Sequence, residues 1–171
     1  MTSILVQLKR SMDKNMTLNC FSTYDVRGKV DVDINAEICY TIGRAFARLI
    51  VAKRIVVGYD ARKSSPEFAK AVTNGILDEG AEVLAIGLCG TEEVYWATTK
   101  FSACGGISVT ASHSPIDFNG LKFVKSGSEA LEPDTEFVKL KEIAQNQEFR
   151  VAKNRGYLKN INSTARKEYV K

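Results

Sequence analysis

The chain has 171 residues, of which 44% are hydrophobic and 26% charged, the ordinary balance of a soluble globular protein. This length accommodates one domain, or one domain with a tail, and the apolar content can fill a core without disulfides or metals. The formal net charge of +4 comes from residues 151–171, which hold six Lys or Arg and one Glu, so the basic excess does not indicate nucleic-acid binding.

Cysteine spacing and the length of apolar runs bear on the cellular compartment. The four cysteines form no C-x-x-C pair and lie in apolar stretches, which favours buried free thiols in a reducing environment. No apolar run has the length of a membrane span, and the apolar residues 4–6 are too few for a secretory signal. We therefore predict a cytoplasmic protein that has no membrane partner.

Strand-like and helix-like segments alternate from residue 16 onward, the pattern of an α/β domain. A helix is expected after each of the capping residues Asn35 and Ser65, and another from Thr91. A further helix is expected over residues 133–147. Apolar runs predict strands at residues 18–24, 55–59, 83–86, 106–109 and 121–124, with a turn at 25–28 closing the first.

The two ends of the chain have a different character. Residues 1–15 show no periodicity, and we expect a loosely ordered N-terminal extension there. Residues 145–159 are polar and are interpreted as a connector, after which a helix is predicted from Ser163. We therefore divide the chain into the extension 1–15, one domain at 16–150, and a segment 151–171 that leads toward a second domain.

One loop holds the residues that could carry chemistry. The predicted strand 106–109 runs into Thr110, Ser112 and His113, and the chain then re-enters a strand next to Lys122. Ligands of α/β sheets bind where loops leave the carboxyl ends of strands, and small hydroxylic residues let the backbone approach an anion. His113 is the single histidine, which excludes a two-histidine metal site, and the G-x-S-x-G pattern of serine hydrolases is absent.

Four motifs carry a resemblance to the α-D-phosphohexomutases of the phosphomannomutase/phosphoglucomutase type. Residues 109–122 (V-T-A-S-H-S-P-I-D-F-N-G-L-K) resemble the active-site loop of that family, and residues 24–28 (Y-D-V-R-G) resemble its Y-D-I-R-G. Residues 58–65 (G-Y-D-A-R-K-S-S) are similar to its G-x-D-x-R-x-S-S. Residues 90–98 are similar to a segment of bacterial phosphomannomutases that supply GDP-mannose. The resemblance implies a three-layer α/β domain, with a mixed sheet of about four strands between helices.

The resemblance also implies a mechanism and a set of site residues. Ser112 matches the serine that carries the phosphoryl group exchanged with a hexose monophosphate, and through that phosphate it would also be a metal ligand. Arg27 and Lys122 match residues near the phosphoserine, where Lys122 or His113 would assist proton transfer. The predicted substrate-binding residues are Tyr24, Ser114 and Asn119. Arg62 could steady the loop through an ion pair, and a surface or structural role is an equal alternative.

The resemblance further implies Mg²⁺ in the complete enzyme, a hexose 1,6-bisphosphate as activator, a phosphosugar substrate, and the remaining mutase domains as partners. Two departures from the family pattern limit how far these implications apply to this chain. Ser114 stands where the family usually has Asn, and the aspartate-rich metal motif D-G-D-x-D is absent from the chain. We therefore expect no firmly bound metal and negligible activity from this polypeptide alone. The alternative is a non-catalytic phospho-ligand or protein-interaction module.

Overall fold

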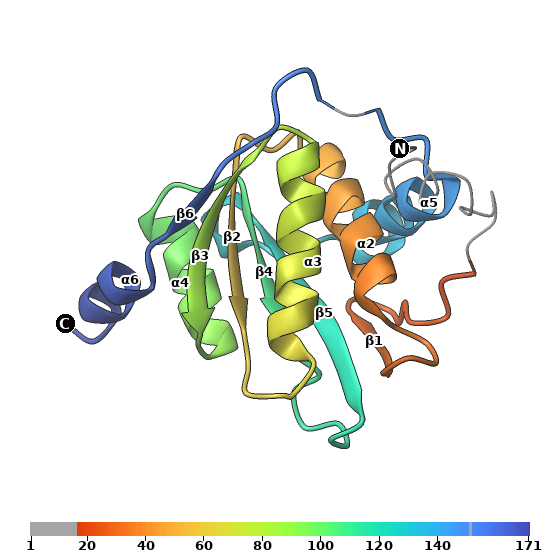
Figure 1. Ribbon diagram of the computed structural model, residues 1–171, viewed down its shortest axis with the longest axis horizontal. Coiled ribbons are helices and arrows are strands. Elements are labelled where there is room, and N and C mark those ends of the chain that lie inside the picture. The colour runs from red at the N-terminus through yellow and green to blue at the C-terminus, as the bar shows by residue number, and fades with distance from the viewer. Residues whose placement is uncertain (1–16, 151) are drawn as a thin grey trace, which may run out of the picture.

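The computed structural model describes residues 17–150 and 152–171, and its centre is a six-stranded mixed β-sheet (Figure 1). The strands lie in the order β1-β5-β4-β2-β3-β6. Strands β2, β3, β4 and β6 run parallel, whereas β5 is antiparallel to both of its neighbours. The strands are β1 (Val26–Lys29), β2 (Arg54–Tyr59), β3 (Glu82–Leu88), β4 (Gly105–Val109), β5 (Phe118–Lys125) and β6 (Leu158–Asn160).

Helices cover both faces of this sheet. Figure 1 shows α2 and α3 side by side in front of the strands and α4 behind them. The α-helices are α2 (Ala36–Leu49), α3 (Ser65–Asp78), α4 (Thr91–Lys100), α5 (Val138–Asn146) and α6 (Asn162–Tyr169). Two shorter helical turns are η1 (Ser126–Ser128) and η2 (Pro133–Phe137). None of the helices in the described part of the chain combines the length and apolarity needed to cross a lipid bilayer.

The core is divided in two by the sheet, because successive side chains of a strand point to opposite faces. In β2, Ile55 and Val57 belong to the larger cluster with α2, α3 and α5, whereas Val56 belongs to the smaller cluster with α4 and α6. The expected three-layer α/β architecture is thus confirmed. The sequence identified β2 by its short apolar run, which is typical of a strand covered on both faces.

The helix starts agree closely with the capping residues in the sequence. Asn35 precedes α2, and its side-chain oxygen accepts a hydrogen bond of 2.9 Å from the backbone N–H of Ile38. At α4 the carboxylate of Glu93 accepts from the N–H of Gly90 at 2.9 Å. Helix α3 begins one residue earlier than predicted, because Ser64 is the capping residue and Ser65 lies in the first turn.

The prediction for the first strand was wrong. Residues 18–24 form no strand beyond a single antiparallel bridge of Phe21 with Val26, and the strand is β1, which includes Arg27 and Gly28 of the segment expected to form a turn. The apolar residues Leu18 and Cys20 are buried as loop residues that pack on the larger core. Strand β1 forms because β5 pairs with it, in the register Val26 with Leu121, and no local pattern reveals a partner so distant in sequence.

The C-terminal segment also differs from its prediction. Helix α5 ends at Asn146, and the stretch interpreted as a connector runs into β6, which pairs in parallel with β3 at the sheet edge. The helix predicted from Ser163 is α6, and it begins one residue earlier. The sheet therefore has six strands where about four were expected. The predicted extension at residues 1–15 lies outside the described residues.

Candidate active site

Two loops meet at the carboxyl ends of neighbouring parallel strands. Strand β2 leads into residues 60–64 and β4 into residues 110–117, and the two strands end side by side with Tyr59 paired to Val109. The backbone N–H of Asp60 donates to the carbonyl of Val109 at 3.0 Å, which joins the loops at their base. Both loops lie at the lower end of the molecule in Figure 1. In open α/β sheets this is where ligands bind.

Ser112 is presented to solvent at the tip of the second loop. Its φ is 51°, a left-handed conformation that non-glycine residues rarely adopt, while Thr110 and Ala111 before it are buried. The Ser112 N–H donates to Oγ1 of Thr110 at 2.9 Å, and the N–H of Ser114 donates to the carbonyl of Ala111 at 3.0 Å. Buried anchors on one side thus support an exposed, conformationally restrained hydroxyl.

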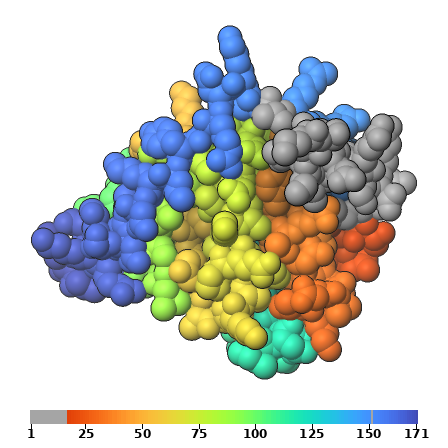
Figure 2. Space-filling view, in the orientation of Figure 1, coloured from red at the N-terminus to blue at the C-terminus, as the bar shows by residue number. Residues whose placement is uncertain are grey.

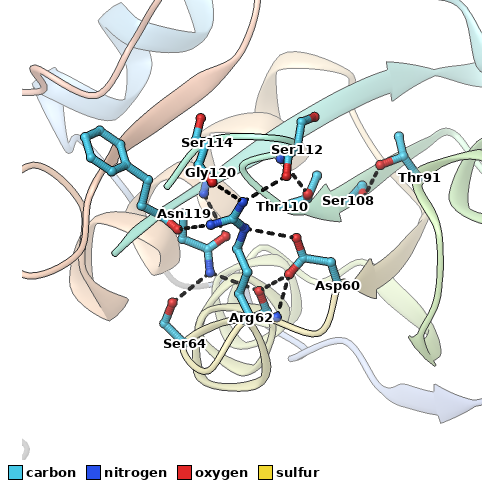
Figure 3. A network of polar contacts seen from close by, with 12 residues as sticks. Asp60, Arg62, Ser64, Thr91, Ser108, Thr110, Ser112, Ser114, Asn119 and Gly120 are labelled. Atoms are coloured by element: carbon cyan, nitrogen blue, oxygen red, sulfur yellow. Dashed lines mark hydrogen bonds and ion pairs between the residues drawn. The ribbon is translucent and has the colours of Figure 1, made fainter. Parts of the chain in front are cut away.

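Arg62 connects the two loops. Its Nη1 donates to the carbonyls of Pro115 and Phe118 at 2.6 and 2.9 Å, and its Nη2 donates to those of Ser112 and Ser114 at 2.8 and 2.7 Å. Figure 3 shows the guanidinium between Asp60 and the Ser112 loop. Nε lies 3.3 Å from a carboxylate oxygen of Asp60, and the Arg62 side chain is only 10% exposed. Arg62 therefore steadies the Ser112 loop through hydrogen bonds to backbone carbonyls, while its ion pair is with Asp60 and not with the loop itself.

A second contact beside the two loops involves Asn119, at the start of β5. This side chain is fully buried, and its amide nitrogen donates to the hydroxyls of Ser64 and Ser65 at 2.8 and 2.9 Å. Its amide oxygen accepts from the N–H of Gly120 at 2.8 Å, and the Ser65 hydroxyl donates to Asp60. All polar atoms of the amide are therefore used inside the protein. The prediction that Asn119 contacts substrate has no support from this position.

Arg27 approaches the loop from β1. Its Nη1 donates to the Ser114 hydroxyl at 3.2 Å, and its Nη2 pairs with the carboxylate of Asp25 at 2.7 Å. That carboxylate is nearly buried, with 7% of the side chain exposed, and it also accepts from the hydroxyl of Ser22. The structure thus brings Arg27 and Ser114 together, as the sequence motifs predicted for a common site. Asp25, which sequence reasoning did not single out, orients the guanidinium.

Tyr24 and Lys122 line a hollow next to these residues. It has a volume of about 410 Å³ and is bounded by β5, Tyr95 of α4 and residues 130–133. Lys122 lies opposite Ser108 in the β4–β5 pairing, and Tyr24 is 70% exposed. The side chain of His113 is exposed at the tip of the loop. Asp25 also lines the hollow, so it connects Tyr24 and Lys122 with Arg27 and, through Arg27, with Ser114.

The cysteines do not belong to this site. Burial raises the pKa of the Cys20 thiol to about 11 and that of Cys89 to about 12, and it raises the pKa of Cys39 well above its usual value. Thiols with such values are protonated at neutral pH and are poor nucleophiles. All four cysteines are free and buried or half-buried, which agrees with the sequence prediction.

Sequence reasoning missed the role of Asp60 and understated that of Arg62. Both belong to the motif of residues 58–65, whose resemblance to a known pattern was the available signal. Spacing alone could not show that Arg62 binds the backbone carbonyl of Ser112, 50 residues later. That contact exists only once β2 and β4 are paired.

Comparison with known proteins agrees with this geometry. Residues 18–151 match the family model described as "Phosphoglucomutase/phosphomannomutase, alpha/beta/alpha domain I". The chain is 39% identical to a phosphomannomutase of Vibrio cholerae over 149 residues, covering 84% of this chain and 32% of that protein. It is 40% identical to a phosphomannomutase of Klebsiella pneumoniae over 155 residues, covering 90% of this chain and 98% of that protein.

Solved structures show the same relationship. A phosphoglucomutase/phosphomannomutase family protein from Burkholderia thailandensis superposes with a TM-score of 0.79 at 26% identity, covering 91% of this chain and 35% of that one. A structure from Thermus thermophilus, with a TM-score of 0.73 at 21% identity, shares the fold. The chain spans about a third of the Vibrio cholerae relative and nearly all of the Klebsiella pneumoniae one. It belongs to the phosphoglucomutase/phosphomannomutase family and carries that family's α/β/α domain I.

Proposed function

We propose that Ser112 carries the phosphoryl group in a mutase reaction that interconverts hexose 6-phosphate and hexose 1-phosphate through a bisphosphate. The observation that carries the proposal is the exposed Ser112 hydroxyl, held in a left-handed conformation at the carboxyl end of β4. In transfer, the bond between phosphorus and the Ser112 oxygen breaks as the hydroxyl of a hexose monophosphate bonds to phosphorus. The serine regains the group when the bisphosphate returns its other phosphoryl group.

The surrounding cations have distinct roles in this proposal. Arg27, fixed by Asp25 and in contact with Ser114, would stabilise negative charge on the transferring group. Lys122 or His113 would take the proton released by the attacking sugar hydroxyl and return it in the reverse step. Tyr24 lines the hollow with Lys122 and would contact the sugar. Ser114 would help to set the position of Arg27.

Mannose 6-phosphate and mannose 1-phosphate are the proposed substrates. Relatives named phosphomannomutase, together with residues 90–98, support mannose over glucose and a place in GDP-mannose synthesis. Residues 91–98 of this segment lie in α4, which Gly90 precedes as the N-cap, and Tyr95 of α4 borders the hollow that Lys122 lines. Substrate preference can be measured as the ratio of kcat/KM for the two sugars in a polypeptide with all mutase domains.

The expected Mg²⁺ does not fit the residues present. Across residues 17–150 and 152–171, no three His, Cys, Asp or Glu side chains gather closely enough to hold a metal ion. Asp60, beside the Ser112 loop, is already bound to Arg62 and Ser65, and Asp117, within the loop, is paired with Lys29 at 3.4 Å. We propose that the metal and the hexose 1,6-bisphosphate activator bind only when the other mutase domains are present, and we derive no step through the metal.

Intact-mass measurement and peptide mapping test the role of Ser112 directly. We expect the purified chain, incubated with a complete phosphomannomutase and hexose 1,6-bisphosphate, to gain one phosphoryl group at Ser112. The Ser112→Ala variant should gain none. Phosphate at another residue, or none in the wild type, would favour a non-catalytic interaction module instead.

A steady-state assay tests whether this polypeptide suffices for turnover. With mannose 1-phosphate, glucose 1,6-bisphosphate and magnesium, we expect negligible activity, because positioning of the sugar supplies much of the catalysis in phosphoryl transfer. Turnover near that of complete relatives would contradict the expectation and would require a metal site that the described residues do not form.

A further inference from the structure

Arg62 is saturated by contacts with the protein itself. A guanidinium has five N–H donors, and here Nη1 and Nη2 bind four carbonyls while Nε faces Asp60. The side chain is 10% exposed. Although it lies beside Ser112, Arg62 has no Nη donor left for a phosphoryl group and its Nε faces Asp60, so its influence passes through the loop backbone.

The carbonyl of Ser112 is one of the four groups that Arg62 binds. In a planar trans peptide the C=O and N–H point in opposite directions. The N–H of the same peptide belongs to His113, so it points away from Arg62. Among the described residues, no acceptor is paired with this N–H. It follows Ser112 directly, so a phosphoryl group on the exposed serine oxygen lies within its reach.

The geometry points to Asp60 and Arg62 as positioning residues that turn the Ser112 carbonyl inward and present the His113 N–H to the phosphoryl group. Four charge-assisted hydrogen bonds can offset the cost of holding Ser112 at a positive φ. Asp60 orients the guanidinium, and it accepts from the N–H of Arg62 at 3.1 Å as well. Lysine cannot replace Arg62, because one ammonium does not reach four carbonyls with the geometry of a planar fork.

This inference rests on the proposed role of Ser112, and the test separates the two. Phosphoserine is installed at position 112 during translation of the full chain, so the result does not depend on whether the protein acquires phosphate itself. The amide and Arg Nε–H resonances of the phosphorylated and unphosphorylated chains are then compared by ¹H–¹⁵N NMR. Failure of the enzymatic labelling experiment would count against the proposed function alone.

In the wild type we expect the His113 amide proton to move strongly downfield on phosphorylation, as for an N–H that donates to a phosphate, while the Arg62 Nε–H resonance stays in place. In Arg62→Lys and in Asp60→Asn the downfield shift of His113 should be lost. In both variants the loop should open more often, because the hydrogen bonds from the charged guanidinium to its carbonyls are weakened, and such bonds contribute more than neutral ones. Amide exchange of Ser112 and Ser114 should therefore become faster by roughly tenfold. The matched control is Lys63→Gln, which changes the adjacent exposed cation and should retain the wild-type shift.

Three results would overturn the inference. One is a His113 shift that persists in both variants. Another is an Arg62 Nε–H resonance that moves as far as the His113 amide, which would make Arg62 a direct phosphate ligand. The third is a shift that is lost in Arg62→Lys but kept in Asp60→Asn. Removing a nearby negative charge does not by itself weaken a hydrogen bond from an N–H to a phosphate. Loss of the shift in Asp60→Asn is therefore expected only if Asp60 orients Arg62. Asp60→Asn keeps the size of the side chain but removes the negative charge that faces the guanidinium, so it remains informative should Arg62→Lys fold poorly.

Discussion

At the scale of single residues, Ser112, the proposed carrier of the phosphoryl group, is exposed to solvent and has a restrained backbone. Ser112 has a φ of 51° although it is not a glycine, and the residues around it hold that conformation. Left-handed conformations cost non-glycine residues about 1 kcal/mol or more. A serine is nevertheless required if its hydroxyl carries the reaction. Local strain at this position is therefore consistent with a functional constraint on the residue type.

Replacing Ser112 by glycine tests that restraint. We expect Ser112→Gly to be at least as stable as Ser112→Ala, because glycine adopts positive φ at little cost, although glycine elsewhere destabilises by roughly 0.5–1 kcal/mol. Urea unfolding of the two variants gives the comparison. A Ser112→Gly variant that unfolds more easily than Ser112→Ala by about 1 kcal/mol would show that the loop relaxes out of the left-handed conformation.

Ser114 gives a second prediction at this scale. Its hydroxyl accepts from Arg27, which stays paired with Asp25 even without it. We therefore expect Ser114→Ala to lower the free energy of unfolding by no more than about 1 kcal/mol, the contribution of one hydrogen bond. Ser114→Asn should retain the loop. A many-fold increase in Ser112 phosphorylation in Ser114→Asn would mean that serine at this position impairs the site.

At the scale of elements, α2 and α3 pack so closely that glycine is required at their contact. A Cβ on Gly75 of α3 would collide with the backbone carbonyl of Tyr40 in α2, and one on Gly43 would meet the carbonyl of Val72. The N-terminus of α3 follows the loop of Asp60 and Arg62, and it supplies Ser65, whose hydroxyl donates to Asp60 and accepts from Asn119. The helix contact thus helps to determine where the loop residues lie.

Gly75→Ala should destabilise the protein by roughly 1–3 kcal/mol, as overpacking usually does, despite a gain of about 1 kcal/mol in helix propensity. Denaturant unfolding measures the change. Lys70→Ala, on the exposed side of the same helix, is the control and should change stability by no more than about 0.5 kcal/mol. Equal effects of the two substitutions would show that the helices can separate without cost.

At the scale of the whole molecule, Asp78 links segments that are far apart in sequence. Its carboxylate accepts from Tyr40 of α2 at 2.7 Å and from Arg155, beyond α5, at 2.6 Å. Figure 2 shows the segment after α5 running across the surface of the molecule, and its strand β6 pairs with β3. Burial alone would raise the pKa of Asp78, but the hydrogen bonds from Arg155 and Tyr40 outweigh it, and the pKa is below its ordinary value.

A lowered pKa in the folded state has a defined consequence for stability. The contribution of Asp78 is present above the pKa of the unfolded chain, about 4, and is lost as the pH falls through the lower folded value. We expect Asp78→Asn to flatten the decline of the free energy of unfolding below roughly pH 4. Urea unfolding across pH measures it, with Glu142→Gln as a control at an exposed carboxylate. Unchanged slopes in both variants would contradict the linkage.

Local sequence patterns predicted the elements whose identity depends on neighbouring residues. The capping side chain of Asn35 and the apolar run of β2 were readable because helix caps and buried strands have local signatures. The Ser112 loop was identifiable because its residues are contiguous in the sequence. The resemblance to a known family rested on such contiguous motifs, and the family comparison bears it out.

Tertiary structure decided what depends on distant partners. The four residues of β1 form a strand because β5 pairs with them, and β6 forms one because the edge of β3 is open to it. The role of Arg62 was settled in the same way. Its guanidinium binds the Ser112 loop only because β2 and β4 end side by side, and pairing across 50 residues leaves no trace in local periodicity. The sequence by itself determined that Ser112 sits in a phosphohexomutase-like loop, whereas the fold decided which side chains hold that loop in place.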